Sequence, residues 1–274
     1  MKLALYQGAS PAGETEAAFV TIGSSLRAAA TAGAGMLVFP ELFLPGYNQP
    51  ALHRSLAQPQ GGPWETHFAA LARHAGCGLT IGWAERDGEI LYNAASCFDG
   101  QGNRIGHYRK IQLYGPMENA VFIPGDDYCI FDFAGYRTAL LICYDVEFAG
   151  HCRALKDLGA ELLLVPTANP AGFEHVSDIL LPARAAEMNL TIAYANYCGP
   201  EDRREDDADS ENRLSFGGGS LLLGPDARML AKAGNRETLL IADLGGPAPI
   251  DPYRVSTQQQ DYRPQEPREA PRPS

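Results

Sequence analysis

Apolar and polar residues follow two recurring patterns along the chain. Short apolar runs bounded by Gly, Pro or Asp indicate buried strands, and longer stretches with apolar residues three or four positions apart indicate amphipathic helices. The predicted strands are residues 2–7, 36–39, 78–84, 90–98, 138–142, 161–166, 190–197, 220–223, 227–231 and 238–242. The predicted helices are residues 14–32, 64–75, 149–158 and 176–189. Strands that alternate with helices predict an α/β domain in which helices cover the sheets.

The last part of the chain has a different composition. From residue 245 onward prolines and polar residues dominate, and residues 258–274 contain almost no apolar side chains. Such a segment cannot form a core of its own. We therefore expect a single domain over residues 1–250 and a Pro-rich tail over residues 251–274, which is either disordered or extended along a partner subunit.

Composition narrows the classes of partner. The 274 residues are 45% hydrophobic, which is enough for one large core, and no stretch approaches the ~20 apolar residues of a membrane helix. The first residues read as a strand and lack the pattern of a signal peptide, so we expect a cytoplasmic protein. The net charge of −11 argues against nucleic acid or an anionic membrane as a partner.

The six cysteines give no metal or disulfide pattern. No two of them form a C-x-x-C pair, and no histidine lies near them at the spacing of zinc ligands. In a cytoplasmic protein we expect reduced thiols, most of which act as small buried hydrophobes.

Cys143 stands in a different context from the other cysteines. An apolar run, residues 138–142, leads directly into it, and a predicted helix begins a few residues later. A strand–turn–helix junction presents a side chain at the carboxyl end of a sheet and turns backbone N–H groups toward it, which suits an oxyanion. Cys143 is therefore either a catalytic nucleophile or a buried core thiol.

A nucleophilic thiol needs a base, and the six histidines have no suitable local context. Glu41 is a better candidate, because it follows an apolar strand and lies among Phe39, Phe43 and Tyr47. Partial desolvation would raise its pKa toward neutrality, where a carboxyl group can take and return protons. Taken alone, the same position also suits a surface glutamate that caps a turn.

Lysine is rare in this chain, with four residues among the 22 basic ones. Lys110 lies between Tyr108 and Tyr114, where a compact positive charge would suit an oxyanion. As a single residue it is equally consistent with a surface lysine whose stem lies along apolar groups.

In the order Glu, Lys, Cys, these three contexts resemble the nitrilase superfamily of carbon–nitrogen hydrolases. The matching motifs are Phe39-Pro40-Glu41, Tyr108-Arg109-Lys110 with Leu113, and Ile142-Cys143-Tyr144-Asp145, supported by Glu118 with Phe122-Ile123-Pro124-Gly125, Arg184-Ala185-Ala186-Glu187, and Gly218-Gly219-Ser220 before Gly224-Pro225-Asp226. The resemblance covers nearly the whole chain and is greatest to the 5-aminopentanamidase-like bacterial amidases. One departure is Gln112, where relatives often carry histidine.

The resemblance implies a four-layer α-β-β-α sandwich, with subunits that pair into a longer sandwich. It implies amide hydrolysis through a thioester on Cys143, with Glu41 as proton acceptor and donor. Lys110 and the backbone N–H of Tyr144 would hold the oxyanion, and Glu118 would orient Lys110 or the substrate amide. No metal or organic cofactor is expected. The expected partners are a small-molecule amide and further copies of the chain, in a homodimer or larger homo-oligomer.

The substrate is expected to be a small aliphatic, amino-substituted carboxamide. Tyr47, Asn169 and Asn196 are expected to contact it, because the two asparagines follow or end predicted strands. An acidic chain favours a cationic substrate over an anionic one, and Glu201 and Asp202 follow a predicted strand that would bring one of them to the pocket mouth. Arg184 and Glu187, three apart on a predicted helix, suit a structural ion pair.

Other functions remain open at this stage. The same Cys-Glu-Lys triad would serve an N-carbamoyl-amine amidohydrolase or a nitrilase, which differ in whether carbon dioxide is released and whether the matching nitrile reacts. A papain-like or amidotransferase enzyme would place a histidine against Cys143. A binding protein that keeps the fold without turnover is a further alternative, and the intact set of Glu41, Lys110 and Cys143 argues against it.

Overall fold

The computed structural model describes residues 1–200, 214–245, 256–261 and 263. Within these residues the strands form two six-stranded sheets and one two-stranded sheet. The first sheet has the order β14-β1-β2-β3-β4-β5. Its strands are β1 (Lys2–Gln7), β2 (Ala34–Val38), β3 (Gly78–Asp87), β4 (Ile90–Phe98), β5 (Arg104–Arg109) and β14 (Thr238–Asp243). Strand β2 is parallel to both β1 and β3, and the other pairings are antiparallel.

The second six-stranded sheet has the order β13-β12-β9-β8-β7-β6. Its strands are β6 (Cys129–Phe133), β7 (Tyr136–Leu140), β8 (Leu162–Pro166), β9 (Thr191–Ala195), β12 (Leu221–Leu223) and β13 (Met229–Lys232). The central trio β7-β8-β9 is parallel, so the carboxyl ends of these strands meet at one edge. The two-stranded sheet pairs β10 (Cys198–Pro200) with β11 (Ser215–Gly217).

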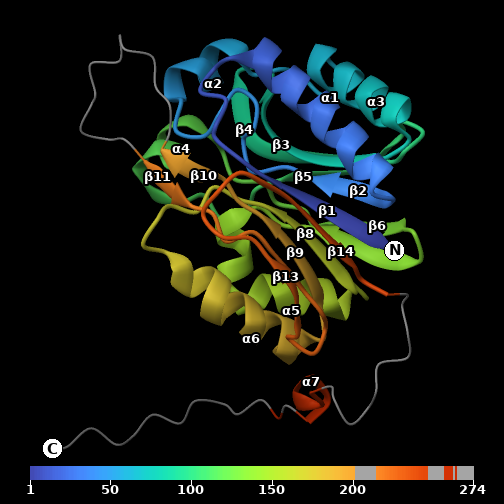
Figure 1. Cartoon of the computed structure of the whole chain (residues 1–274). Coiled ribbons are helices and arrows are strands. Elements are labelled where there is room, and N and C mark those ends of the chain that lie inside the picture. The colour runs from blue at the N-terminus through green and yellow to red at the C-terminus, as the bar shows by residue number, and fades with distance from the viewer. Residues whose placement is uncertain (201–213, 246–255, 262, 264–274) are drawn as a thin grey trace, which may run out of the picture.

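Helices cover the outer face of each large sheet, which gives four layers (Figure 1). Helices α1 (Thr15–Thr31) and α3 (Pro63–Ala75) cover the first sheet, and α5 (Ala149–Asp157) and α6 (Leu181–Met188) cover the second. The remaining helices are α2 (Pro50–Leu56), α4 (Gly115–Val121) and α7 (Gln258–Asp261), with a 3₁₀ turn at Cys143–Glu147 and a π turn at Val176–Leu180. The expected α-β-β-α sandwich is confirmed. No helix in the described segments has the length and apolar character needed to cross a membrane.

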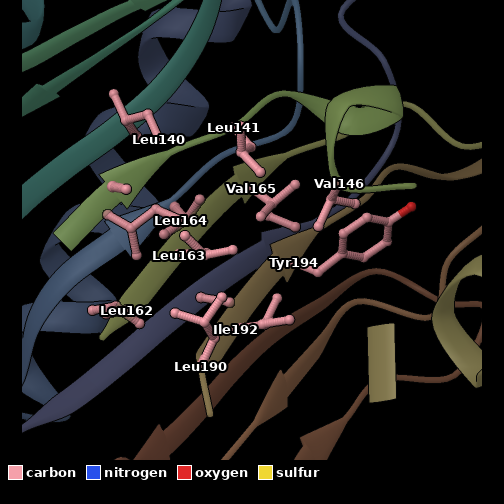
Figure 2. Packing of buried hydrophobic residues seen from close by; sticks show 14 of the residues in the cluster. Leu140, Leu141, Val146, Leu162, Leu163, Leu164, Val165, Leu190, Ile192 and Tyr194 are labelled. Carbon is pink, nitrogen blue, oxygen red and sulfur yellow. The ribbon is translucent and has the colours of Figure 1, made fainter. Parts of the chain in front are cut away.

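The central strands of the second sheet are buried on both faces. All five residues of β8 are buried, as are all five of β9, so these strands read as continuous apolar runs rather than alternating ones. Figure 2 shows the aliphatic side chains of β7, β8 and β9 packed together, with Tyr194 beside Val146 near the strand ends. This packing fixes the backbone that leads into the 3₁₀ turn.

Strand β5 is not predicted by the hydrophobic pattern, because charged and polar residues alternate along it. Its polar side chains form hydrogen bonds and ion pairs with side chains of neighbouring elements. His107 Nε2 lies 2.8 Å from Glu85 Oε2. The Arg104 guanidinium lies 2.8 Å from the buried carboxylate of Glu65, and Arg109 pairs with Glu85. This network holds β5 against its neighbours and fixes the position of the residue that follows it, Lys110.

Candidate active site

Three strand ends bring Glu41, Lys110 and Cys143 together. Glu41 follows β2 and Lys110 follows β5, both in the first sheet, whereas Cys143 follows β7 in the second. Their exposed fractions are 0%, 1% and 8%. The three residues that the sequence selects therefore meet in a space almost closed to water.

The ammonium group of Lys110 lies between two buried carboxylates. Its Nζ donates to Glu41 Oε1 at 2.6 Å and to Glu118 Oε1 at 2.8 Å. Glu118 is fully buried and also accepts from the Tyr47 hydroxyl at 2.7 Å and from the Tyr114 N–H at 3.1 Å. Charge-assisted bonds of this kind fix the lysine in one orientation. The expected link between Glu118 and Lys110 is thus present, and Tyr47 contacts Glu118.

One carboxylate oxygen of Glu41 is held and the other is free for proton transfer. Oε1 accepts from Lys110 and from Asn93 Nδ2 at 2.7 Å, whereas the buried Oε2 has no hydrogen-bond partner among the described residues. Burial raises the pKa of Glu41 to about 7, because the opposing charge of Lys110 does not cancel desolvation and the charge of Glu118 adds to it. A carboxyl group with this pKa can accept and release protons near neutrality.

Cys143 begins the 3₁₀ turn with a left-handed backbone, φ 46°. Burial raises the pKa of its thiol well above the ordinary value, and the charge of Glu41 raises it further. The charge of Lys110 and a hydrogen bond from the Ala168 N–H lower the pKa of the thiol but do not outweigh burial. The resting thiol is therefore protonated, and a base must remove its proton before the sulfur attacks.

Asp145 ties the Cys143 turn to the segment around Lys110. Its buried carboxylate accepts from the Ile142 N–H at 3.0 Å, within the turn. It also accepts from the Gln112 N–H at 2.7 Å and from the Tyr108 hydroxyl at 2.9 Å, across the sandwich. Asp145 thereby fixes Cys143 relative to Lys110.

The two predicted asparagines hold backbone at the edge of the site. Asn196 Oδ1 accepts from the N–H groups of Asn169 at 2.8 Å and Tyr197 at 2.9 Å, and its Nδ2 donates to the Gly218 carbonyl at 2.8 Å. Asn169 Nδ2 donates to the Phe173 carbonyl at 3.1 Å. Glu201 and Asp202, one of which is expected at the pocket mouth, lie outside the described residues.

A cavity of about 240 Å³ adjoins these asparagines. Asn169, Asn196, Tyr194 and Glu174 are among the residues that line it. Tyr194 lines this cavity, and the pKa of its phenol is raised well above the ordinary value by burial and then by the charge of Cys143. The cavity is large enough for a small organic molecule.

Several residues that support the site have no signal in the sequence. Asn93 lies within β4 and bonds Glu41, and the Tyr197 hydroxyl donates to the Glu41 carbonyl at 2.8 Å. The Glu41 N–H donates to the Thr167 carbonyl at 3.3 Å. Asp145 lies within a recognised motif, but its partners on the other sheet emerge only from the fold.

A histidine-based mechanism has no geometric support. The charges that act most strongly on Cys143 are those of Glu41 and Lys110. The two ring nitrogens of His151 lie 3.1 Å from Gln112 Nε2 and 2.7 Å from the Tyr128 hydroxyl. Among the residues that the structure describes, no group of three or more His, Cys, Asp or Glu side chains is arranged to hold a metal ion.

Comparison with known proteins agrees with this geometry. The model of the carbon–nitrogen hydrolase family matches residues 2–245. A protein named hydrolase in pqqF 5′ region, from Pseudomonas protegens, is 41% identical over 216 residues, which cover 77% of this chain and 72% of that protein. An (R)-stereoselective amidase from Pseudomonas sp is 31% identical over 264 residues, which cover 96% of this chain and 90% of that protein.

Solved structures of an amidase from Nesterenkonia sp. AN1 are similar across the whole fold. The TM-score is 0.84 at 34% identity, and the match covers 96% of each chain. One variant of that amidase was solved with acrylamide joined by Michael addition to the active-site cysteine, and another variant was solved in complex with butyramide.

Proposed function

Since the chain belongs to the carbon–nitrogen hydrolase family, we propose that it is an amidase that converts a small aliphatic, amino-substituted carboxamide to the acid and ammonia. The proposed route is a thioester on Cys143. The observation that carries the proposal is the arrangement of buried groups, in which a lysine ammonium bridges two carboxylates next to a protonated thiol. Each group supplies a separate part of acyl transfer from an amide.

The first half of the reaction forms the thioester. Glu41 takes the Cys143 proton as the sulfur attacks the amide carbon, and the carbonyl oxygen becomes an oxyanion. The Lys110 ammonium and the backbone N–H of Tyr144, at the start of the 3₁₀ turn, stabilise that charge. Protonated Glu41 then donates to the amide nitrogen, the C–N bond breaks, and ammonia leaves.

The second half restores the enzyme. Water attacks the thioester carbon and gives a proton to Glu41. The thioester carbonyl oxygen becomes a second oxyanion, which Lys110 and the Tyr144 N–H stabilise as before. Collapse of this intermediate breaks the C–S bond, releases the carboxylic acid, and returns the proton from Glu41 to the Cys143 sulfur. Because Glu41 takes and gives a proton in each half, the pKa of about 7 suits both directions.

A screen for ammonia release tests the proposal. The substrates are short alkyl amides, ω-amino amides, the matching nitriles, and N-carbamoyl amines. We expect ammonia from amides, no reaction with nitriles, and no carbon dioxide from carbamoyl compounds. Cys143→Ala should abolish turnover, and Cys198→Ala, which removes a thiol on β10 outside the site, should retain it. Turnover by Cys143→Ala, or a preference for nitriles, would overturn the proposal.

We also propose that the enzyme is a homodimer or larger and that the Pro-rich tail contributes to assembly. The support is the sequence of residues 251–274, which contains too few apolar side chains for a core of its own. In the described part of this tail, the Ser256 carbonyl accepts from Asn189 Nδ2, at the end of α6 in the same chain. Removing residues 251–274 should weaken self-association in sedimentation experiments. A monomeric, fully active full-length protein at micromolar concentration would contradict this proposal.

A further inference from the structure

Glu147 is a half-buried carboxylate that the mechanism does not use. It is the last residue of the 3₁₀ turn that begins with Cys143. Side chains three apart in a 3₁₀ helix lie one above the other, so Glu147 lies on the same side of the turn as Tyr144. Tyr144 is the residue next to Cys143, so Glu147 belongs to the same short turn as the proposed nucleophile.

The carboxylate of Glu147 makes no hydrogen bond or ion pair with any described residue. Its backbone carbonyl accepts from Arg184 Nη2 at 2.8 Å, and Arg184 Nη1 pairs instead with Glu187 at 3.2 Å, as the sequence predicts for that pair. A partly desolvated charge without a partner is unfavourable, and a cationic ligand would offset that cost.

The charge of Glu147 interacts with Lys110 and Tyr194. Burial raises the pKa of Glu147, whereas the nearby charges of His175, Lys110 and Arg184 lower it. The phenol of Tyr194 experiences the charges of both Cys143 and Glu147. Glu147, four positions after Cys143 in the same turn, therefore lies close enough to Lys110 and Tyr194 for its charge to act on them.

Aromatic rings line the same side of the turn. The Tyr144 ring packs edge-on against Tyr114 at 5.1 Å and against Phe148 at 4.8 Å, measured between ring centroids. Phe173 packs edge-on against Tyr114 at 6.2 Å. Tyr114 and Phe148 are each 37% exposed, so their surfaces are open to a ligand. Aromatic faces attract organic cations, and an alkyl chain also packs well against them.

We propose that Glu147, with the rim of Tyr114, Tyr144, Phe148 and Phe173, binds the ammonium group of an ω-amino amide while its carboxamide reacts at Cys143. This inference rests on the proposed amidase function and assigns its substrate preference to one residue. A substrate with a carboxylate in place of the ammonium would meet like charge at Glu147 and would be disfavoured.

The test compares three amides of similar length, namely 5-aminopentanamide, pentanamide and the monoamide of glutaric acid. For the wild type we expect kcat/KM to be highest with the amine and lowest with the carboxylate. In Glu147→Gln, kcat/KM for the amine should fall roughly tenfold more than for pentanamide, which is a modest loss for a charged contact that water partly screens. Glu147→Lys should favour the carboxylate.

Glu187→Gln is the matched control, because it removes one negative charge from α6, close to Arg184, but outside the rim. It should keep the wild-type ratio of amine to pentanamide. If the ratio of amine to pentanamide falls as much in Glu187→Gln as in Glu147→Gln, the preference comes from the overall negative charge of this region and not from a site at Glu147. That result would overturn the proposal. Equal losses on all three amides in Glu147→Gln would overturn it as well, since that is the result of a structural role.

Two further outcomes are decisive. A wild type that hydrolyses pentanamide as well as the amine refutes the ammonium site but leaves the amidase standing. A wild type that hydrolyses no amide refutes the proposed function, and the ammonium site falls with it. If Glu147→Gln does not fold, Glu147→Asp keeps the charge on a shorter side chain. It should raise KM more for the amine than for pentanamide, and equal changes would overturn the proposal.

Discussion

Replacing Glu118 by glutamine removes one of the two carboxylates that flank the Lys110 ammonium. The charge of Glu118 helps to raise the pKa of Glu41, and Lys110 lowers it. In Glu118→Gln the like charge is lost, and Lys110 is left with Glu41 as its carboxylate partner. Both changes lower the pKa of Glu41, by roughly one unit or more. In the proposed mechanism ionised Glu41 is the base, so activity should be lost as pH falls through this pKa, and the acid limb should move to lower pH in the variant.

The stability cost follows from the hydrogen bonds of Glu118. An amide oxygen can still accept from Lys110 and Tyr47, but its NH₂ group then faces the Tyr114 N–H, whose bond to Glu118 Oε2 is 3.1 Å long. One partly buried donor loses its acceptor, which costs about 1–3 kcal/mol, and loss of the charge on a buried ion pair adds to this. We expect a total near 2–4 kcal/mol and a fall in kcat/KM of roughly ten- to a hundredfold, since Lys110 is displaced but not removed.

The assay is the pH dependence of kcat/KM for ammonia release from a neutral amide, paired with urea unfolding. The wild type should show an acid limb with its midpoint near the pKa of about 7. Tyr47→Phe is the control, because it removes a hydrogen bond to the same oxygen but keeps the charge of Glu118. An acid limb that stays in place, or moves upward, in Glu118→Gln would refute the electrostatic reasoning. A wild-type midpoint near that of an ordinary carboxylate would refute the desolvation of Glu41.

Three other substitutions test separate parts of the structure. Glu41→Gln should reduce kcat at least ~10²-fold with the fold intact by circular dichroism, and wild-type-like turnover would exclude its role as base. Asp145→Asn should lower kcat more than it raises KM, because the Cys143 turn loses its anchor, and an effect on KM alone would contradict that positioning role. Burial acts to raise the pKa of Glu85, but hydrogen bonds from His107 and Arg109 outweigh it and lower the pKa to about 2. Glu85 therefore stabilises the wild type above the pKa of an unfolded glutamate, and this contribution, on the order of 3 kcal/mol, is lost as pH falls from about 5 toward 2. Unfolding of Glu85→Gln should depend less on pH across that window, and identical acid transitions would refute the assignment.

The strands whose bounds the sequence pattern predicts best are those with turn-forming residues at their ends. β1 and β4 have the predicted bounds, because apolar residues fill them and Gly or Asp residues follow or precede them. β5 is missed because Arg104, His107 and Arg109 break the apolar pattern, and only the fold shows that they pair with buried glutamates. The predicted helix 176–189 is correct in place, but its first turn is a π turn.

The residues of the site also fall into two groups, those that local sequence patterns predict and those that only the fold reveals. Glu41, Lys110 and Cys143 can be selected from sequence because each lies in a local context that suits its chemistry. Asn93 and Tyr197 cannot, because their bonds to Glu41 span 52 and 156 positions and neither lies in a local motif. Local patterns identify reactive groups, whereas the residues that fix their geometry depend on how distant strands meet.

Glu41, the proposed base, follows a strand of one sheet, and its backbone is hydrogen-bonded to the other sheet. Glu41 follows β2, yet its N–H bonds the Thr167 carbonyl after β8, and its carbonyl accepts from Tyr197 after β9. Any slippage between the sheets must break these bonds before it exposes the core. Heat inactivation and separation of the sheets should therefore occur together, without a partly unfolded form that retains activity. A reagent that bonds covalently to Cys143 and also contacts Glu41 would link the two sheets. It should therefore raise the melting temperature of the entire domain.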